Sequence, residues 1–334
     1  MSELNSKNPA RLDLILAQVN PLVGDIPGNT ALVINTTRNL LEHKPLDIVV
    51  FPELVLTAYP PEDLLLRASL DVRIEAALKQ IMQEKFDTHL VIGYPGKEDG
   101  RLYNMLCVIY RGEILATYKK QCLPNYQVFD EKRYFDPGTE PCVLTIQGVP
   151  VSFSICEDLW EVGPIAQAAA AGAGLMININ GPPFHINKSD ERLETLRMRQ
   201  QEAEMPIVYV NQVGGQDELV FDGCSMALDS DGSLAALAPA CEECLLPLSI
   251  TWDGERAKIV EGAVSPLEEG AALIYKLLVQ GLKDYASKNK FDGVVLGLSG
   301  GIDSALTLAI AVDALGCDKV HAVMMPFKYT SEIS

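Results

Sequence analysis

Basic residues are scarce in this sequence. The 334 residues contain 27 Lys and Arg against 45 Asp and Glu, which gives a formal net charge of −18. Because a protein that binds a nucleic-acid backbone needs a basic surface, this balance excludes a nucleic-acid-wrapping function. It leaves open the binding of a small anion by a few local backbone amides.

Long apolar runs are also missing. No uninterrupted apolar stretch reaches about 18 residues, so we expect no membrane span, and the polar start of the chain predicts no signal peptide. Eight cysteines do not make a disulfide framework in a chain of this length, and they favour a reducing cytoplasmic location. Apolar residues nevertheless make up 48% of the chain, which provides a sizeable core and excludes wholesale disorder.

Apolar strand-like runs alternate with amphipathic windows up to about residue 250. The pattern predicts strands at 12–19, 46–51, 89–93, 175–180 and 207–211, hairpins at 103–118 and 143–155, and helices at 29–41, 70–86, 166–172 and 189–204. Because the strands are apolar on both sides, both sheet faces need cover, and a second similar sheet is the natural cover for one of them. We therefore predict an α/β protein whose first domain, residues 10–255, is an α-β-β-α four-layer sandwich rather than a simple Rossmann fold.

A second unit follows an interval without periodicity at 252–266. The sequence predicts a helix at 268–288 and then one βαβ unit, with strands at 293–298 and 320–325 around a helix at 305–315. Two strands are too few for a parallel sheet. We therefore expect residues 256–334 to be the beginning of a doubly wound parallel α/β domain that is truncated in this chain. We expect the helix at 268–288 and the following βαβ unit to be poorly ordered or packed against a neighbouring molecule.

Cys156 is the sharpest local feature, because it ends an apolar strand and polar residues follow it. A nucleophile at such a position can sit on a tight strand-to-helix turn, with backbone N–H groups nearby to hold an oxyanion. The alternative is a small core residue, which is the interpretation we favour for most other cysteines of the chain. A nucleophilic cysteine also needs a group that makes it a thiolate. Of the four histidines only His185 is a candidate neighbour, so we expect a different base.

Two other predicted strand ends offer charged partners. Glu53 follows one buried strand, and the adjacent Lys119 and Lys120 follow another. Each of these side chains could be solvated if taken alone. Together with Cys156 they make a stronger case, because a buried carboxylate can act as general base on a thiol while an ammonium group holds the thiolate and the oxyanion.

Glu53, Lys120 and Cys156, in this order and setting, resemble the Glu-Lys-Cys triad of the nitrilase (carbon–nitrogen hydrolase) family. The runs at 123–131, 133–135 and 156–160 are similar to the glutaminase branch of that family. The resemblance covers about residues 12–250 and implies the α-β-β-α sandwich. It further implies Glu53 as base, Lys120 as oxyanion stabiliser and Cys156 as nucleophile.

The same resemblance implies that Tyr126 and Glu157 bind the substrate glutamine. One departure concerns the loop after the next strand, where relatives tend to carry a Ser-Pro step and, six residues after the serine, an arginine or lysine. Here Pro182 stands in place of the serine and offers no hydroxyl group. Lys188 could still meet the substrate carboxylate, as a point charge rather than a bidentate fork.

A glycine-rich turn joins the first strand and the helix of the second unit. Its residues are Ser299, Gly300, Gly301, Ile302, Asp303 and Ser304. Two glycines between a strand and a helix allow backbone N–H groups to converge on an anion at the helix N-terminus, whereas the alternative is an ordinary capped βα turn. The run is not a Walker A motif. It resembles the pyrophosphate loop of N-type ATP pyrophosphatases, and the segments 325–326 and 329–331 resemble NAD synthetases.

A nitrilase-type glutaminase followed by this loop resembles the glutamine-dependent NAD synthetases. The resemblance implies that glutamine hydrolysis supplies ammonia for the amidation of deamido-NAD with ATP and Mg²⁺, in a homo-oligomer. We predict no metal-ligand set, since the CxxC at 241–244 has no second ligand pair. Because a doubly wound fold builds its crevice from several strand ends, we expect the chain by itself to hydrolyse glutamine and not to make NAD. Two alternatives stay open, a stand-alone small-amide amidase or carbamoylase and a non-catalytic binding module.

Overall fold

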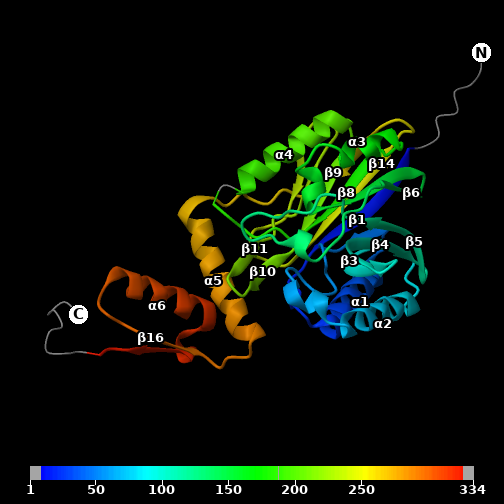
Figure 1. Cartoon of the computed structure of the whole chain (residues 1–334). Helices are drawn as coiled ribbons and strands as arrows, with labels where there is room; N and C mark the ends of the chain where they lie inside the picture. Colours follow the sequence, from blue (N-terminus) through cyan, green and yellow to red (C-terminus); the bar gives the residue numbers. More distant parts are fainter. Residues whose placement is uncertain (1–8, 187, 326–334) are drawn as a thin grey trace, which may run out of the picture.

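Two mixed β-sheets form the centre of the molecule, and helices cover them on the outside (Figure 1). The structure is a computed structural model that describes residues 9–186 and 188–325, without the side chains of residues 188 and 189. The first sheet has seven strands in the order β15-β14-β1-β2-β3-β4-β5, and the second has six in the order β13-β12-β9-β8-β7-β6.

The elements follow one another along the chain with these bounds. The strands of the first sheet are β1 (Ala10–Gln18), β2 (Ile48–Val50), β3 (His89–Glu98), β4 (Arg101–Tyr110), β5 (Glu113–Lys119), β14 (Cys244–Trp252) and β15 (Ala257–Glu261). Those of the second are β6 (Cys142–Ile146), β7 (Val149–Ile155), β8 (Leu175–Asn180), β9 (Ile207–Asn211), β12 (Met226–Leu228) and β13 (Leu234–Leu237). The helices are α1 (Ile26–His43), α2 (Ser69–Gln83), α3 (Pro164–Ala170), α4 (Lys188–Ala203), α5 (Gly270–Lys288) and α6 (Ile302–Leu315). Short 3-10 helices lie at η1 (Glu62–Leu66), η2 (Glu131–Arg133), η3 (Cys156–Leu159) and η4 (Cys317–Lys319).

Strand β1 shows why the layers stack as they do. Successive side chains of a strand point to opposite faces of the sheet. Leu14 and Leu16 therefore lie in the apolar core between the two sheets, whereas Ile15 and Ala17 lie in the core beneath α1 and α2. The second sheet repeats this arrangement, because Ile177 of β8 faces the first sheet and its neighbour Met176 lies in the core shared with α3 and α4. The predicted α-β-β-α sandwich is confirmed.

Strand β3 is longer than the sequence indicates. The sequence predicts a strand at 89–93, yet the strand continues to Glu98 and pairs with β4 through Pro95↔Asn104. Proline is tolerated there because β2 pairs with β3 only as far as Val91, so that beyond this point β3 has a strand on one side alone. At the other edge of the same sheet, β15 pairs with β14 and extends the sheet past residue 255.

The second unit contains the predicted βαβ arrangement. Parallel strands β16 (Val294–Gly297) and β17 (Val320–Val323) flank α6. The expectation that the preceding helix is poorly ordered or packed on another molecule is wrong for this chain. Helix α5 packs against the hairpin of β10 (Val213–Gln216) and β11 (Leu219–Asp222), where apolar contacts and a buried polar network hold it. Within the described residues, no helix is both long and apolar enough to span a membrane.

A buried ion pair fixes α4 to the end of β11. Arg192 and Asp222 are both almost fully buried, and their charged groups meet at 3.0 Å. The guanidinium also lies 5.4 Å from the ring centroid of Tyr209. Because a buried charge is tolerated only when it is paired, each partner depends on the other.

Replacing Asp222 by alanine should therefore lower the free energy of unfolding by about 3–5 kcal/mol, since it leaves the Arg192 charge buried and unpaired. Denaturant unfolding monitored by circular dichroism measures this loss. The matched control is Lys79→Ala, which breaks an exposed i,i+4 pair with Glu75 and should change the midpoint little. Equal losses in the two variants would contradict the structural role given to the buried pair.

Candidate amidase site

The three predicted strand-end residues converge at one place in the sandwich. Lys120 directly follows β5, Cys156 directly follows β7, and Glu53 lies in the turn after β2. Strands β2 and β5 run in the same direction, so their carboxyl ends share one edge of the first sheet. The backbone N–H of Glu53 donates to the carbonyl of Asn180 at the end of β8, which ties this edge to the second sheet.

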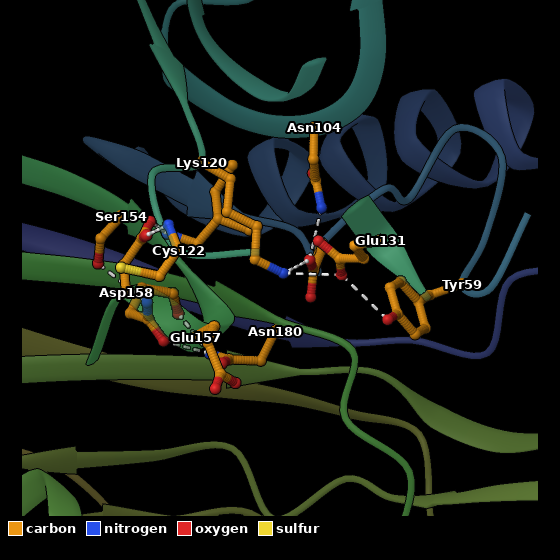
Figure 2. Close-up of polar contacts among 12 residues, drawn as sticks. Tyr59, Asn104, Lys120, Cys122, Glu131, Ser154, Glu157, Asp158 and Asn180 are labelled. Atoms are coloured by element: carbon orange, nitrogen blue, oxygen red, sulfur yellow. Dashed lines mark hydrogen bonds and ion pairs between the residues drawn. The ribbon is translucent and has the colours of Figure 1, made fainter. Parts of the chain in front are cut away.

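Lys120 is the centre of the polar cluster (Figure 2). Its fully buried Nζ donates to Oε1 of Glu53 and to Oε1 of Glu131, each at 2.8 Å. Asn104 Nδ2 donates to the same Glu53 oxygen at 2.7 Å, and the hydroxyl of Tyr59 donates to Glu131 at 3.0 Å. Burial alone would lower the pKa of Lys120, but the two carboxylates outweigh it and raise the pKa well above the usual value. The lysine is therefore a fixed cation.

The neighbouring lysine is excluded from this cluster. Lys119 points the other way and pairs with Glu98 at 2.8 Å, with its side chain partly exposed. His185, the candidate histidine, faces Glu191 at 3.5 Å on the surface. The geometry thus places Lys120 against the two carboxylates and keeps Lys119 and His185 away from them.

Glu131 is a member of the site that sequence reasoning missed. It stands in a mixed charge run at 130–133, which is normally a solvated face, and the other members of the run are exposed. Glu131 alone is turned inward by the 3-10 turn η2 and is 4% exposed. Burial raises its pKa, and Lys120 opposes that rise. The only signal in the sequence was the surrounding family-like run at 123–135.

Cys156 lies at the sharp turn between β7 and η3. Its backbone φ is 45°, an uncommon value for a residue with a side chain and one that recurs at functional sites. The side chain is 3% exposed. Burial, and then Glu53, raise the pKa of the thiol well above its usual value, while Lys120 acts in the opposite direction. These surroundings favour the protonated form, and a nucleophilic cysteine then needs an acceptor for its proton.

Glu53 offers such an acceptor. Among the described residues, its second oxygen, Oε2, has no hydrogen-bond partner although it is fully buried. An unpaired buried carboxylate oxygen is costly and calls for an explanation. A proton or an amide N–H arriving at Cys156 would satisfy it.

Asp158 joins the two sides of the site. Its buried carboxylate accepts from the backbone N–H of Cys122 at 2.8 Å and of Ile155 at 3.0 Å, and from the hydroxyl of Tyr118 at 2.7 Å. These partners flank Lys120 on one side and Cys156 on the other. Asp158 stands in the family-like run at 156–160, but its bridging contacts arise only when the two sheets meet.

Tyr126 and Glu157 lie together at the mouth of the cluster. The hydroxyl of Tyr126 donates to Glu157 at 3.0 Å, and both residues line a cavity of about 760 Å³. Tyr126 also lines a neighbouring cavity of about 310 Å³ with Phe184 and His185. Lys188 begins α4, and its side chain lies outside the described residues.

The glycine-rich turn of the second unit lies between β16 and α6, as the sequence predicts. Gly300 has a φ of 80°, which glycine adopts without strain. The hydroxyls of Ser299 and Ser304 lie 3.1 Å apart, and the loop is exposed. The segment at 326–334, including residues 329–331, lies outside the described residues. In the described part of the chain, no group of three His, Cys, Asp or Glu side chains is placed to hold a metal ion.

Two families of known proteins match this chain in succession. The carbon-nitrogen hydrolase family matches residues 16–253, and the NAD synthase family matches residues 274–334. A glutamine-dependent NAD(+) synthetase of Acinetobacter baylyi is 41% identical over 322 residues, which are 96% of this chain and 59% of that protein. One of Aquifex aeolicus is 42% identical and is matched over 62% of its length. The chain therefore spans about 60% of the curated relatives that it matches.

Solved structures give the same picture of the fold. A glutamine-dependent NAD+ synthetase of Acinetobacter baumannii, in complex with ADP, superposes with a TM-score of 0.91 at 41% identity, over 97% of this chain and 61% of that one. An amidase of Nesterenkonia superposes with a TM-score of 0.66 at 24% identity, over 76% and 95% of the two chains, which is a likeness of fold. Because its first match covers most of the described sandwich, the chain belongs to the carbon-nitrogen hydrolase family.

Proposed function

We propose that residues 10–255 hydrolyse the side-chain amide of glutamine and that residues 256–334 contribute to the amidation of deamido-NAD with ATP. The observation that carries the first part is the buried Lys120 between two carboxylates beside the Cys156 thiol. The second part is supported by the similarity to glutamine-dependent NAD(+) synthetases and by the glycine-rich loop at the start of α6.

The amidase half follows from the charges of the site. Glu53 takes the proton of Cys156 through its free oxygen, and the thiolate attacks the amide carbon. The Lys120 ammonium stabilises the oxyanion that develops, because it is already fixed in a water-poor site. Glu53 returns the proton to the leaving nitrogen, so ammonia departs and a thioester remains. Glu53 then activates water, which releases glutamate and restores the thiol.

The mouth of the site suits an amino acid better than a simple amide. We propose that Glu157, held by Tyr126, binds the α-ammonium group of glutamine, and that Lys188 meets the α-carboxylate. Pro182 is buried in the loop between β8 and α4 and contributes no hydroxyl. A small aliphatic amide has no charge for Glu157 to recognise.

The loop of the second unit suits the phosphates of ATP. Residues Ser299 to Ser304 place backbone N–H groups and two hydroxyls at the N-terminus of α6, where an anion is favoured. Mg²⁺ would arrive with the phosphates, since it is usually held by one or two carboxylates and by substrate oxygens. Asp303 is the carboxylate within this loop. We further propose a homo-oligomer in the cytoplasm, where the eight free cysteines would stay reduced.

A glutamine analogue carrying an electrophile should label Cys156 and no other cysteine. Cys122 lines the adjoining cavity, but it lies outside the cluster of Glu53 and Lys120 that supplies the proposed base and the ammonium group, so we expect it to stay unlabelled. Peptide mass mapping after labelling identifies the site. Labelling of Cys122, together with glutamine hydrolysis by Cys156→Ala, would reject the assignment.

Lys120→Ala should lower glutaminase turnover at least about a hundredfold, because the oxyanion loses its charged partner. Glu53→Gln should also lower glutaminase turnover about a hundredfold or more, because it removes the general base. Lys119→Ala is the matched control and should retain near-normal turnover, since Lys119 pairs with Glu98 away from the cluster. Normal turnover in Lys120→Ala is the result that would overturn this proposal.

The identity of the substrate is tested by Glu157→Gln. This change should raise KM for glutamine by about tenfold or more, the effect expected when a charge-assisted hydrogen bond is lost. Hydrolysis of acetamide, which carries no ammonium group, should change little. A wild-type chain that prefers acetamide to glutamine would instead favour the stand-alone amidase, and a chain that hydrolyses neither would favour the binding module.

A further inference from the structure

The hairpin β10–β11 reaches the outer pocket, a cavity that lies next to the proposed amidase site and shares Tyr126 with it. Leu219 of β11 lines the cavity of about 310 Å³ together with Tyr126 and Phe184. The carbonyl of Val220 accepts from the backbone N–H of Phe184 at 2.8 Å. The position of β11 therefore sets both its own contribution to the pocket and that of the loop after β8.

The next residue of β11 reaches the catalytic cluster. The ring of Phe221 packs edge-on against Tyr59, with centroids 6.5 Å apart and planes at 88°. Tyr59 in turn donates to Glu131, the second carboxylate at Lys120. A single short strand thus contacts the binding pocket and the charged cluster.

This hairpin depends on its surroundings. It is a sheet of only two strands, which is marginally stable by itself. Helix α5 lies beside it (Figure 1). The approach is close at Gly215 of β10, where an added Cβ would lie 2.9 Å from Cα of Gly281 in α5. Only a residue without a side chain fits at this contact.

Asp284 of α5 holds β10 at the same point. Its Oδ2 accepts from the backbone N–H of Gly215 at 2.6 Å, from Nδ2 of Asn20 at 2.9 Å and from Nε2 of Gln280 at 2.7 Å. The residue is 6% exposed. A carboxylate removed from water in this way is stabilised by the N–H groups that it accepts from.

Lys288 lies one turn further along α5 and binds the backbone carbonyl of Gly215, whose N–H donates to Asp284. Its Nζ donates to the carbonyl of Gly215 at 2.8 Å, to Oδ1 of Asn20 at 2.7 Å and to the carbonyl of Pro21 at 3.1 Å. All three ammonium protons have acceptors. Burial lowers the pKa of Lys288, and Asp284 opposes this.

We propose that Asp284 and Lys288 are positioning residues for the outer pocket, the cavity of about 310 Å³ that Tyr126 shares with the glutamine-binding cavity proposed above. Asp284 and Lys288 bind the N–H and the carbonyl of Gly215 and so fix the position of β10. Strand β11 pairs with β10, so the positions of Leu219 and Phe184 depend on it as well. Helix α5 lies outside the family match at residues 16–253, so this part of the chain would set the substrate affinity of the preceding domain. The inference rests on the glutaminase function proposed above.

The first test compares two changes of the same type on one helix. Lys288→Met removes the half-buried ammonium group and keeps the length of the side chain, whereas Lys283→Met removes an ammonium group at an exposed position of α5. We expect Lys288→Met to raise KM for glutamine about tenfold, the effect of losing one set of charge-assisted hydrogen bonds. Lys283→Met should match the wild type.

A second readout separates positioning from general loss of structure. Iodoacetamide is small and needs the thiol of Cys156 but not the outer pocket, so its alkylation rate should be equal in both variants and in the wild type. A change in kcat and alkylation as large as the change in KM would overturn the proposal. So would a wild-type KM in Lys288→Met.

Gly215→Ala gives an independent test without any change of charge, and it decides the matter if Lys288→Met does not fold. Its new Cβ would collide with the backbone of Gly281 and push the hairpin from α5, so KM should rise while iodoacetamide alkylation stays unchanged. A Gly215→Ala chain with wild-type KM would refute the inference. If the wild-type chain itself did not hydrolyse glutamine, the proposed function would fail instead.

Discussion

The site is organised around one buried cation. Lys120 is fully enclosed, and an ammonium group in such a place must be paired. Glu53 and Glu131 supply the pairing, and each is drawn into the interior by it. The same charge that makes the cluster possible is then available to stabilise the oxyanion. Charge pairing and the proposed stabilisation of the transition state would both follow from this single arrangement.

The two sheets have to meet correctly for this arrangement to exist. The lysine follows a strand of the first sheet and the cysteine follows a strand of the second. Asp158 bridges them by accepting backbone N–H groups from Cys122 and Ile155, next to each of these residues. Apolar packing between the sheets provides the contact, and the buried carboxylate fixes the register at the point where chemistry is proposed.

The second unit is joined to the sandwich through backbone groups rather than through a broad apolar face alone. Asp284 and Lys288 of α5 hold Gly215, and α6 packs on α5, where Tyr275 donates to Asp313 at 2.6 Å. The glycine-rich loop and the amide pocket are therefore connected by packed elements with few intervening steps. The proposed positioning role of α5 depends on these contacts with Gly215.

The sequence by itself determined the layers and the principal residues. Continuous apolar strands on both faces required a second sheet, and the polar residues at strand ends indicated Glu53, Lys120 and Cys156. It did not separate Lys120 from Lys119 by chemistry, because adjacent residues of a strand end differ only in the face to which they point. Glu131 looked like one charge in a solvated run, since burial depends on what packs over a turn. Which lysine enters the cluster, whether Glu131 is buried and how α5 contacts the hairpin depend on packing between segments that are distant in the chain. Only the tertiary structure decides them.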